Sequence, residues 1–74
     1  MNLSDTKTGL TCKIVRLHAK DKILQKLLDM GFTKNSIITI LREAPLYDPM
    51  ELNIKGYNIA LRKSEAALIE VEPL

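Results

Sequence analysis

Residues 50–62 have the sequence MELNIKGYNIALR, in which apolar and polar side chains alternate on both sides of one glycine. The apolar positions are Met50, Leu52 and Ile54 before the glycine and Tyr57, Ile59 and Leu61 after it. Alternation with a period of two predicts strands with one buried face, and Gly56 supplies the positive φ that a tight hairpin turn requires. The stretch therefore predicts a β-hairpin that covers an apolar core.

Three further segments have the composition of strands. Residues 11–18 (TCKIVRLH) and 36–42 (SIITILR) precede the hairpin, and residues 68–72 (LIEVE) follow it. Because β-branched residues are enriched in strands, each segment is predicted to add a strand. Ile14 and Leu17 are three residues apart, so strict alternation fails in the first strand. A bulge, or burial on both faces, would explain that spacing.

The strand predicted at residues 36–42 has apolar side chains of both parities. Ile38 and Ile40 are the better candidates for the inner face, which leaves Ile37 and Leu41 pointing outward. The outer face of this strand is therefore predicted to be unusually apolar.

A short amphipathic helix is predicted at residues 21–30 (DKILQKLLDM). Its apolar residues fall on one helical face, which we expect to pack against the sheet: Ile23, Leu24, Leu27 and Leu28. Asp21 is placed to cap the first turn, and Gly31 stands where a left-handed residue commonly ends a helix.

Length and composition limit the chain to one small domain. Its 74 residues are 46% hydrophobic, which suffices for a single core. A chain of this size buries only about 60% of its unfolded surface. Residues 1–8 are mostly polar and are predicted to be loose, which leaves residues 9–74 as one mainly β domain. Five short strands and one helix after the first strand favour a small, partly open barrel.

Cellular location is inferred from segments that the sequence lacks. No apolar run approaches the roughly 20 residues that cross a bilayer, and the N-terminus has no charged-then-apolar signal pattern. The single cysteine, Cys12, has no partner for an internal disulfide, which fits a reducing compartment. We therefore expect a cytoplasmic protein without membrane insertion.

Few side chains are candidates for catalysis or metal binding. Cys12 and His18 are the only cysteine and histidine, and in an extended strand they lie roughly 20 Å apart. Because a nucleophilic cysteine needs a base and a lowered pKa, an enzyme is not expected. Asp48 and Glu51 are three residues apart, but Asp-Pro is typical of a turn and Glu51 has the outer parity of its strand. We expect no catalytic residue, metal site or cofactor.

Glycine placement and charge disfavour nucleotides and nucleic acids as partners. The three glycines are scattered, so there is no glycine-rich phosphate loop. The net charge is only +2, and Asp21 and Asp29 dilute the lysines nearby. The basic candidates are Lys20, Lys22, Lys26 and Lys34, and the aromatic candidates are Phe32, Tyr47 and Tyr57. Because so few rings offer little base stacking, we expect no nucleic-acid partner.

The segment between the second and third strands, residues 44–49 (APLYDP), is the strongest candidate for a binding loop. Two prolines stiffen it and withhold amide donors, so its shape is set at low entropic cost. Leu46 and Tyr47 are bulky residues at its centre. Either Leu46 folds back over the core, or the loop presents an apolar anchor to a protein partner.

Several motifs in order resemble those of the FeoA family. They are LLDMGF at 27–32, LREAPLYDP at 41–49, GYNIALR at 56–62, and EA at 65–66 followed by IEV at 69–71. The resemblance implies an SH3-like five-stranded small barrel with one short helix inserted after the first strand. It also implies a cytoplasmic accessory or regulator of bacterial ferrous iron uptake. The implied partner is the cytoplasmic region of FeoB, a membrane GTPase transporter.

Two residues depart from the family pattern. Asn35 stands where the family usually has glycine, and asparagine tolerates the left-handed conformation. Tyr47 stands where the loop usually has glycine, so a ring there changes the loop backbone or the surface that a partner meets.

Partner binding is accordingly expected at the loop and on the outer face of the second strand, through Leu46, Tyr47, Ile37 and Leu41. The alternative is a metal-sensing or iron-chaperone domain, in which His18, Asp48 or Glu51 would bind Fe(II) or Mn(II) directly. The apolar outer face of residues 36–42 also leaves a homo-oligomer open.

Overall fold

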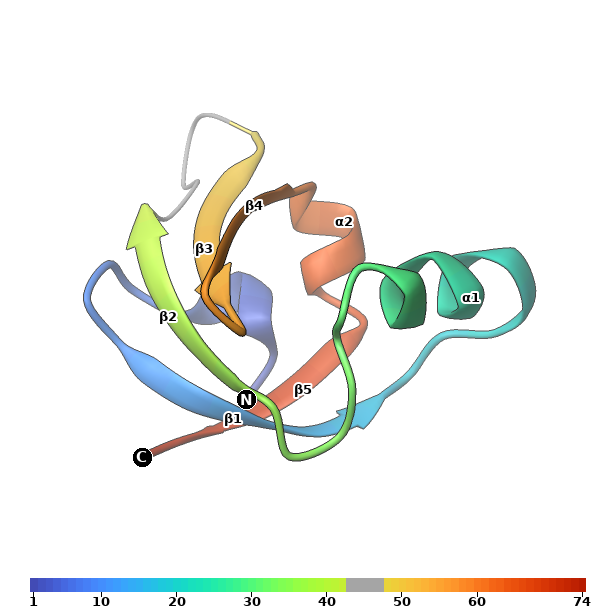
Figure 1. The fold of residues 1–74 in the computed structure, drawn as a ribbon, viewed down its shortest axis with the longest axis horizontal. Coiled ribbons are helices and arrows are strands. Elements are labelled where there is room, and N and C mark those ends of the chain that lie inside the picture. The colour runs from blue at the N-terminus through green and yellow to red at the C-terminus, as the bar shows by residue number, and fades with distance from the viewer. Residues whose placement is uncertain (43–47) are drawn as a thin grey trace.

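The protein is a single curved antiparallel sheet with short helices, in a computed structural model that describes residues 1–42 and 48–74. The strands are β1 (Thr11–Leu17), β2 (Ile37–Arg42), β3 (Met50–Ile54), β4 (Tyr57–Leu61) and β5 (Ile69–Pro73). The helices are α1 (Asp21–Asp29), α2 (Lys63–Ala66) and a 3-10 turn at Leu3–Asp5. The strand order β4-β3-β2-β1-β5 curls into a partly open barrel, as predicted (Figure 1).

The hairpin forms as the alternation predicts. Every residue of β3 pairs with one of β4 without a register shift, from Met50 opposite Leu61 to Ile54 opposite Tyr57. The connection has two residues with positive φ, 53° at Lys55 and 84° at Gly56, which is the pattern of a type I′ turn. The glycine was predicted to adopt this conformation, and the lysine before it was not.

Tyr57 corrects one part of the predicted hairpin. The alternation placed it on the buried face with Ile59 and Leu61, but 73% of Tyr57 is exposed. It follows the turn directly on β4, the last strand of the sheet, so no described strand lies beyond it to cover the ring.

β1 is irregular at the predicted place. Its pairing with β5 shifts register between Ile14 and Arg16, so Val15 is an extra residue in the strand. An inserted residue of this kind is a β-bulge and reverses the parity of the side chains that follow. The bulge explains why Ile14 and Leu17, three residues apart, both contact the core.

The core fills the inside of the curled sheet. It includes the predicted inner residues of β2, Ile38 and Ile40, and those of β5, Ile69 and Val71. The remaining buried apolar residues are Leu3, Cys12, Ile14, Leu27, Phe32, Met50, Leu52, Ile54, Leu61 and Ala66. Among the described residues the core is almost wholly aliphatic, with Phe32 as its one aromatic ring, as the composition leads one to expect.

Helix α1 matches the predicted residues 21–30 to within one position, but its first turn is not capped as predicted. Gly31 has a φ of 97°, as a left-handed helix-ending residue should. The predicted cap at Asp21 is wrong, because the cap position falls on Lys20 and no side chain bonds the first turn there. Asp21 is the first helical residue, with a φ of 55°. Its carboxylate therefore lies one position after the N-cap and does not bond the first-turn amides.

The apolar face of α1 is only partly covered, which corrects the expectation that all of it packs on the sheet. Leu27 is fully buried, whereas Ile23 is 47% and Leu28 is 39% exposed. In Figure 1 the helix projects from one side of the barrel, and Leu27 is the α1 residue that is buried in the core. A helix that docks mainly through one residue leaves the flanking apolar residues in solvent.

The first residues of the chain are bound to the barrel, contrary to the prediction that residues 1–8 are loose. Leu3 is fully buried, and the Thr6 hydroxyl donates a 2.6 Å hydrogen bond to the Leu3 carbonyl. Asn2 forms a β-bridge with Glu70, next to a 2.8 Å bond from the Val71 amide to the Met1 carbonyl. A buried leucine outweighs the polar composition around it and anchors the segment.

Candidate functional site

The binding loop predicted from its prolines is described only at its end. Leu46 and Tyr47, the residues expected to contact a partner, lie outside the described residues. Asp48 and Pro49 are described and exposed, and the chain enters the core again at Met50. The described end of the loop therefore leads directly into β3.

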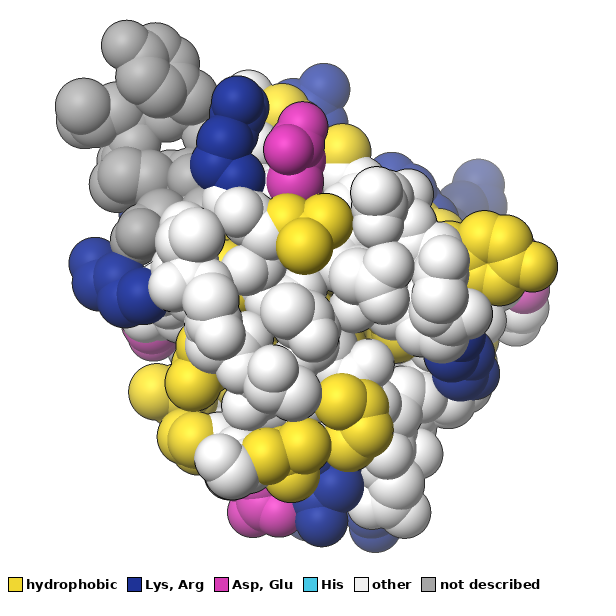
Figure 2. Space-filling view, turned by 60° about the vertical axis from the view of Figure 1, so that its left-hand side comes forward, with side chains coloured by type: hydrophobic (Ala, Val, Ile, Leu, Met, Phe, Trp, Pro, Cys, Tyr) yellow, Lys and Arg dark blue, Asp and Glu magenta, His cyan; other side chains and the backbone are white. Residues whose placement is uncertain are grey.

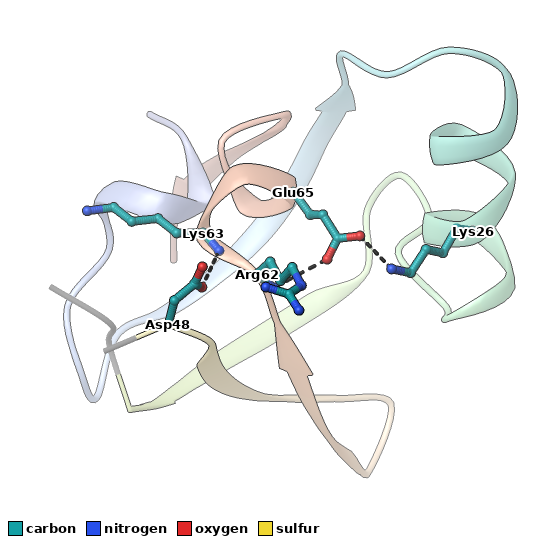
Figure 3. A network of polar contacts seen from close by, with 5 residues as sticks. All are labelled: Lys26, Asp48, Arg62, Lys63 and Glu65. Carbon is teal, nitrogen blue, oxygen red and sulfur yellow. Dashed lines mark hydrogen bonds and ion pairs between the residues drawn. The ribbon is translucent and has the colours of Figure 1, made fainter. Parts of the chain in front are cut away.

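Asp48 has a structural role at this loop end. Its Oδ1 atom accepts a 2.7 Å hydrogen bond from the Lys63 amide, the first amide of α2 (Figure 3). First-turn amides have no partner within their own helix, so a carboxylate at this point satisfies one of them. Asp48 thus ties the end of the loop to α2.

A second carboxylate, Glu65, joins α2 to α1. Its Oε2 atom accepts a 2.7 Å bond from Lys26 Nζ, and its Oε1 atom accepts a 3.3 Å bond from the Arg62 amide (Figure 3). The side chain is only 15% exposed. The hydrogen bond from Lys26 is the main reason that the pKa of the Glu65 carboxyl lies below its ordinary value. One of the lysines considered for nucleic-acid contact is therefore engaged within the protein.

The other two predicted partner-binding residues, Ile37 and Leu41, are exposed as expected, by 44% and 41%. They do not form one patch, because they are four positions apart along β2, a distance of about 13 Å. Ile37 pairs with Lys13 of β1 at one end of β2, and Leu41 lies at the other end. Figure 2 shows apolar side chains in separate small patches on the face that it presents.

Leu41 belongs instead to a groove that the sequence did not reveal. The groove has a volume of about 270 Å³ and is lined by Leu41, Glu51, Asn58, Ile59 and Ala60. Its residues come from β2, β3 and β4, and Ala60 stands opposite Glu51 in the β3–β4 pairing. The outer parity of Glu51 and Ala60 was visible in the alternation, but their contribution to a hollow was not.

Of the residues considered for metal binding, His18 contacts another potential ligand, Glu70. His18 Nε2 lies 2.8 Å from Glu70 Oε1 on the surface, and this contact is the main cause that lowers the pKa of the Glu70 carboxyl. Asp48 is engaged by α2, and Glu51 lines the groove. Within residues 1–42 and 48–74, no three His, Cys, Asp or Glu side chains are grouped closely enough to hold a metal ion.

Cys12 is a core residue. It is fully buried, and burial raises the pKa of its thiol above the ordinary value. A thiol in this state is protonated near neutral pH and a poor nucleophile.

None of the helices among the described residues is both long enough and apolar enough to cross a bilayer.

The fold and surface define a small SH3-like barrel with a groove beside β4, the strand at one edge of the sheet. Comparison with known proteins gives the family. The model of the FeoA domain matches residues 1–73. The chain therefore belongs to the FeoA family.

A relative in Porphyromonas gingivalis is a fusion of Fe(2+) transport protein A with the Fe(2+) transporter FeoB. It is 42% identical over 72 residues, which are 97% of this chain. This chain spans only 8% of the fusion protein.

Solved structures of several proteins are similar to this one over nearly the whole chain. Iron(II) transport protein A from Clostridium thermocellum superposes with a TM-score of 0.94 at 43% identity, covering 100% of this chain and 46% of that one. A FeoA from Stenotrophomonas maltophilia, described as a prokaryotic SH3 domain protein complexed with zinc, has a TM-score of 0.84 at 26% identity. That match covers 97% of this chain and 89% of the other. The SH3-like fold expected from the family resemblance is confirmed.

Proposed function

We propose that this protein is an accessory or regulatory component of bacterial ferrous iron uptake that binds the cytoplasmic region of a FeoB-like transporter. The main support is the Porphyromonas gingivalis relative, in which a domain 42% identical to this chain is covalently joined to FeoB. Fusion keeps two proteins at a high effective concentration, which favours pairs that act together. The Stenotrophomonas maltophilia FeoA has likewise been put forward as an activating factor of ferrous iron transport.

The proposed mechanism is selective binding without catalysis by this chain. A partner shifts a conformational equilibrium only when it binds one state more tightly than the other. This protein would therefore prefer one nucleotide-dependent conformation of the transporter. The contact residues proposed for this are Leu46, Tyr47, Ile37 and Leu41, of which the last two are exposed on β2.

Titration against the soluble GTP-binding region of a FeoB-like transporter tests the proposal. Calorimetry with GTP analogue, with GDP and without nucleotide should give affinities that differ among the states. Leu41→Ser should weaken binding at least about fivefold, because an exposed apolar anchor is lost. Leu28→Ser, with a similarly exposed leucine on α1, is the matched control and should bind as the parent does.

Absence of binding in every nucleotide state, including to the full transporter in membranes, would overturn the proposal. Equilibrium dialysis against Fe(II) separates it from the metal-binding alternative. Two side chains, His18 and Glu70, meet on the surface, and such a pair offers too few ligands for tight binding. Micromolar Fe(II) binding that His18→Ala abolishes would favour the alternative instead.

A further inference from the structure

Strand β4 forms one end of the sheet and pairs only with β3 among the described strands. Its pairing is regular from end to end, and its sequence, Tyr57–Leu61, contains no charged residue and no proline. Natural edge strands usually carry a lysine, a proline or a bulge that prevents another chain from pairing. β4 has none of these devices, so its free edge can accept a strand.

The turn determines which backbone groups face this free edge. In a two-residue hairpin the flanking residues, Ile54 and Tyr57, exchange hydrogen bonds, and every second pair along the strands does the same. Asn58 and Ala60 are the alternate residues of β4, so their N–H and C=O groups point away from β3. Both residues are exposed, and no backbone hydrogen bond from them to another described element is present.

The groove lies on the outer face of this same strand. Asn58, Ile59 and Ala60 form one side of it, and Leu41 and Glu51 form the rest. Strands lie about 4.8 Å apart, so a residue added opposite Ala60 would be about 10 Å from the Glu51 backbone. The small Ala60 side chain leaves room for a long side chain to lie across it toward Glu51.

Charge decides which long side chain fits. Glu51 is exposed, and Arg42 stands opposite it in the β2–β3 pairing. None of the described residues, Arg42 included, forms an ion pair with Glu51, so its carboxylate can accept a cation from outside. Lysine and arginine combine an apolar stem, which suits Leu41 and Ala60, with a cationic head, which suits the Glu51 carboxylate. An acidic side chain at the same position would be repelled.

We propose that β4 binds an extended segment of another protein by strand addition, with a lysine or arginine side chain of that segment lying in the groove against Glu51. Backbone hydrogen bonds to Asn58 and Ala60 supply affinity, and the groove supplies selectivity for a basic residue. The proposal requires only a polypeptide partner and does not depend on the transporter proposed above.

A second copy of this chain fits the site less well. Symmetric antiparallel pairing along the whole of β4, centred on Ile59, brings Asn58 of one copy opposite Ala60 of the other. No residue of β4 is basic, so this arrangement gives Glu51 no cation. The charge therefore favours a different protein as the occupant.

The test uses the isotopically labelled full chain and short blocked peptides of alternating threonine and valine. One peptide has a central lysine, a second has a central glutamate, and a third is the lysine peptide with N-methylated backbone amides. NMR titration measures binding, and amide hydrogen exchange reports protection of Asn58 and Ala60. We expect the lysine peptide to protect both amides and to bind about threefold more tightly than the glutamate peptide. N-methylation should abolish binding.

Charge reversal supplies the decisive variant. Glu51→Lys should invert the preference, so that the glutamate peptide binds more tightly than the lysine peptide. Glu72→Lys, at an exposed glutamate in β5, is the matched control and should leave the preference unchanged. Both sites are on the surface, so the fold should survive either change.

Three results would overturn the proposal. The first is no response of the Asn58 and Ala60 amides to any peptide at millimolar concentration. The second is equal binding of the lysine and glutamate peptides. The third is protection of these amides that rises with protein concentration alone, which would assign the edge to a second copy. Transporter binding in the titration above is measured separately, so either proposal can fail while the other stands.

Discussion

Two carboxylates fix the position of α2: Asp48, which precedes β3, and Glu65, which belongs to α2 itself. Asp48 bonds its first amide at 2.7 Å, and Glu65 bonds Lys26 of α1 at 2.7 Å. A helix of four residues, Lys63–Ala66, is far too short to be stable without tertiary contacts. The position of α2 therefore depends on individual hydrogen bonds as well as on the burial of Ala66.

Replacing Asp48 with alanine should lower the free energy of unfolding by about 1 kcal/mol, because the Lys63 amide loses its acceptor. Urea denaturation measures the change. Asp5→Ala is the matched control, because Asp5 is an exposed aspartate without positive φ and its side chain bonds no amide of the described helices, and it should change stability by less than about 0.5 kcal/mol. Equal losses in the two variants would contradict the role assigned to Asp48.

Glu65→Gln should weaken the protein in a pH-dependent way. The folded-state pKa of the Glu65 carboxyl is lowered, chiefly by Lys26, so ionised Glu65 stabilises the fold above the ordinary pKa of glutamate. That contribution is lost as the pH falls through the lowered folded-state pKa. Unfolding free energies should therefore differ by about 0.5–1 kcal/mol near neutral pH and converge in acid.

Glu72→Gln provides the comparison for this pH series. Glu72 also forms an ion pair, with Lys13 at 3.0 Å, but its side chain is 55% exposed. Solvent screens such a pair, so a smaller difference is expected across the same pH range. A Glu65→Gln deficit that stays constant from neutral to acid pH would show that packing, not charge, is responsible.

At the residue scale, the sequence predicted which residues have structural roles better than it predicted their partners. Asp-Pro indicated a turn at residue 48, and the hydrogen bond that the Lys63 amide donates to Asp48 bears out a structural role for that carboxylate. The partner lies 15 positions away and is a backbone amide, which carries no signature of its own. The groove beside Ala60 was missed for a similar reason, since a hollow depends on which strand ends the sheet.

At the scale of elements, periodicity was sufficient for the hairpin and the helix. Alternation in β3 and β4 specified their pairing, because a one-residue slip would turn every buried side chain toward solvent. Gly31 marked the end of α1. The exposure of Ile23 and Leu28 could not be predicted, because a helical pattern shows which face is apolar but not how much of that face the rest of the domain covers.

The hairpin turn offers a stabilising substitution. Lys55 has a φ of 53°, which costs most residues free energy and costs asparagine less. Lys55→Asn creates the Asn-Gly pair favoured in type I′ turns and should raise stability by about 0.5 kcal/mol despite losing the 3.2 Å bond to Thr33. Thermal unfolding measures the gain. Lys34→Asn, at an exposed lysine without positive φ, should show none.

At the scale of the whole molecule, the barrel includes its own N-terminal segment. The polar composition of residues 1–8 concealed this, because a single apolar residue is too weak a signal to predict docking. Leu3 is nevertheless as buried as any residue of the sheet. Long-range packing of that kind is settled by the shape of the finished barrel and leaves little trace in local sequence.

Leu3→Ala should lower the free energy of unfolding by about 3 kcal/mol, since it leaves a cavity in the core. For a small domain that is a large part of the total stability. Leu28→Ala makes the same chemical change at a 39% exposed site and should cost less than about 1 kcal/mol. Chemical denaturation of both variants measures the difference, and a loss no greater at Leu3 than at Leu28 would mean that the N-terminal segment is dispensable.

The pairing of Met1 with Val71 sets a condition on folding during protein synthesis. The amide and carbonyl of Val71 both bond Met1, at 2.8 and 3.2 Å, and β5 lies beside β1. These contacts join opposite ends of the sequence, and such distant pairings form slowly. Until β5 has been synthesised, Leu3 and the inner side of β1 lack the contacts that β5 makes with them. Of the described strands, β5 is thus the one that completes the core around Leu3 and β1.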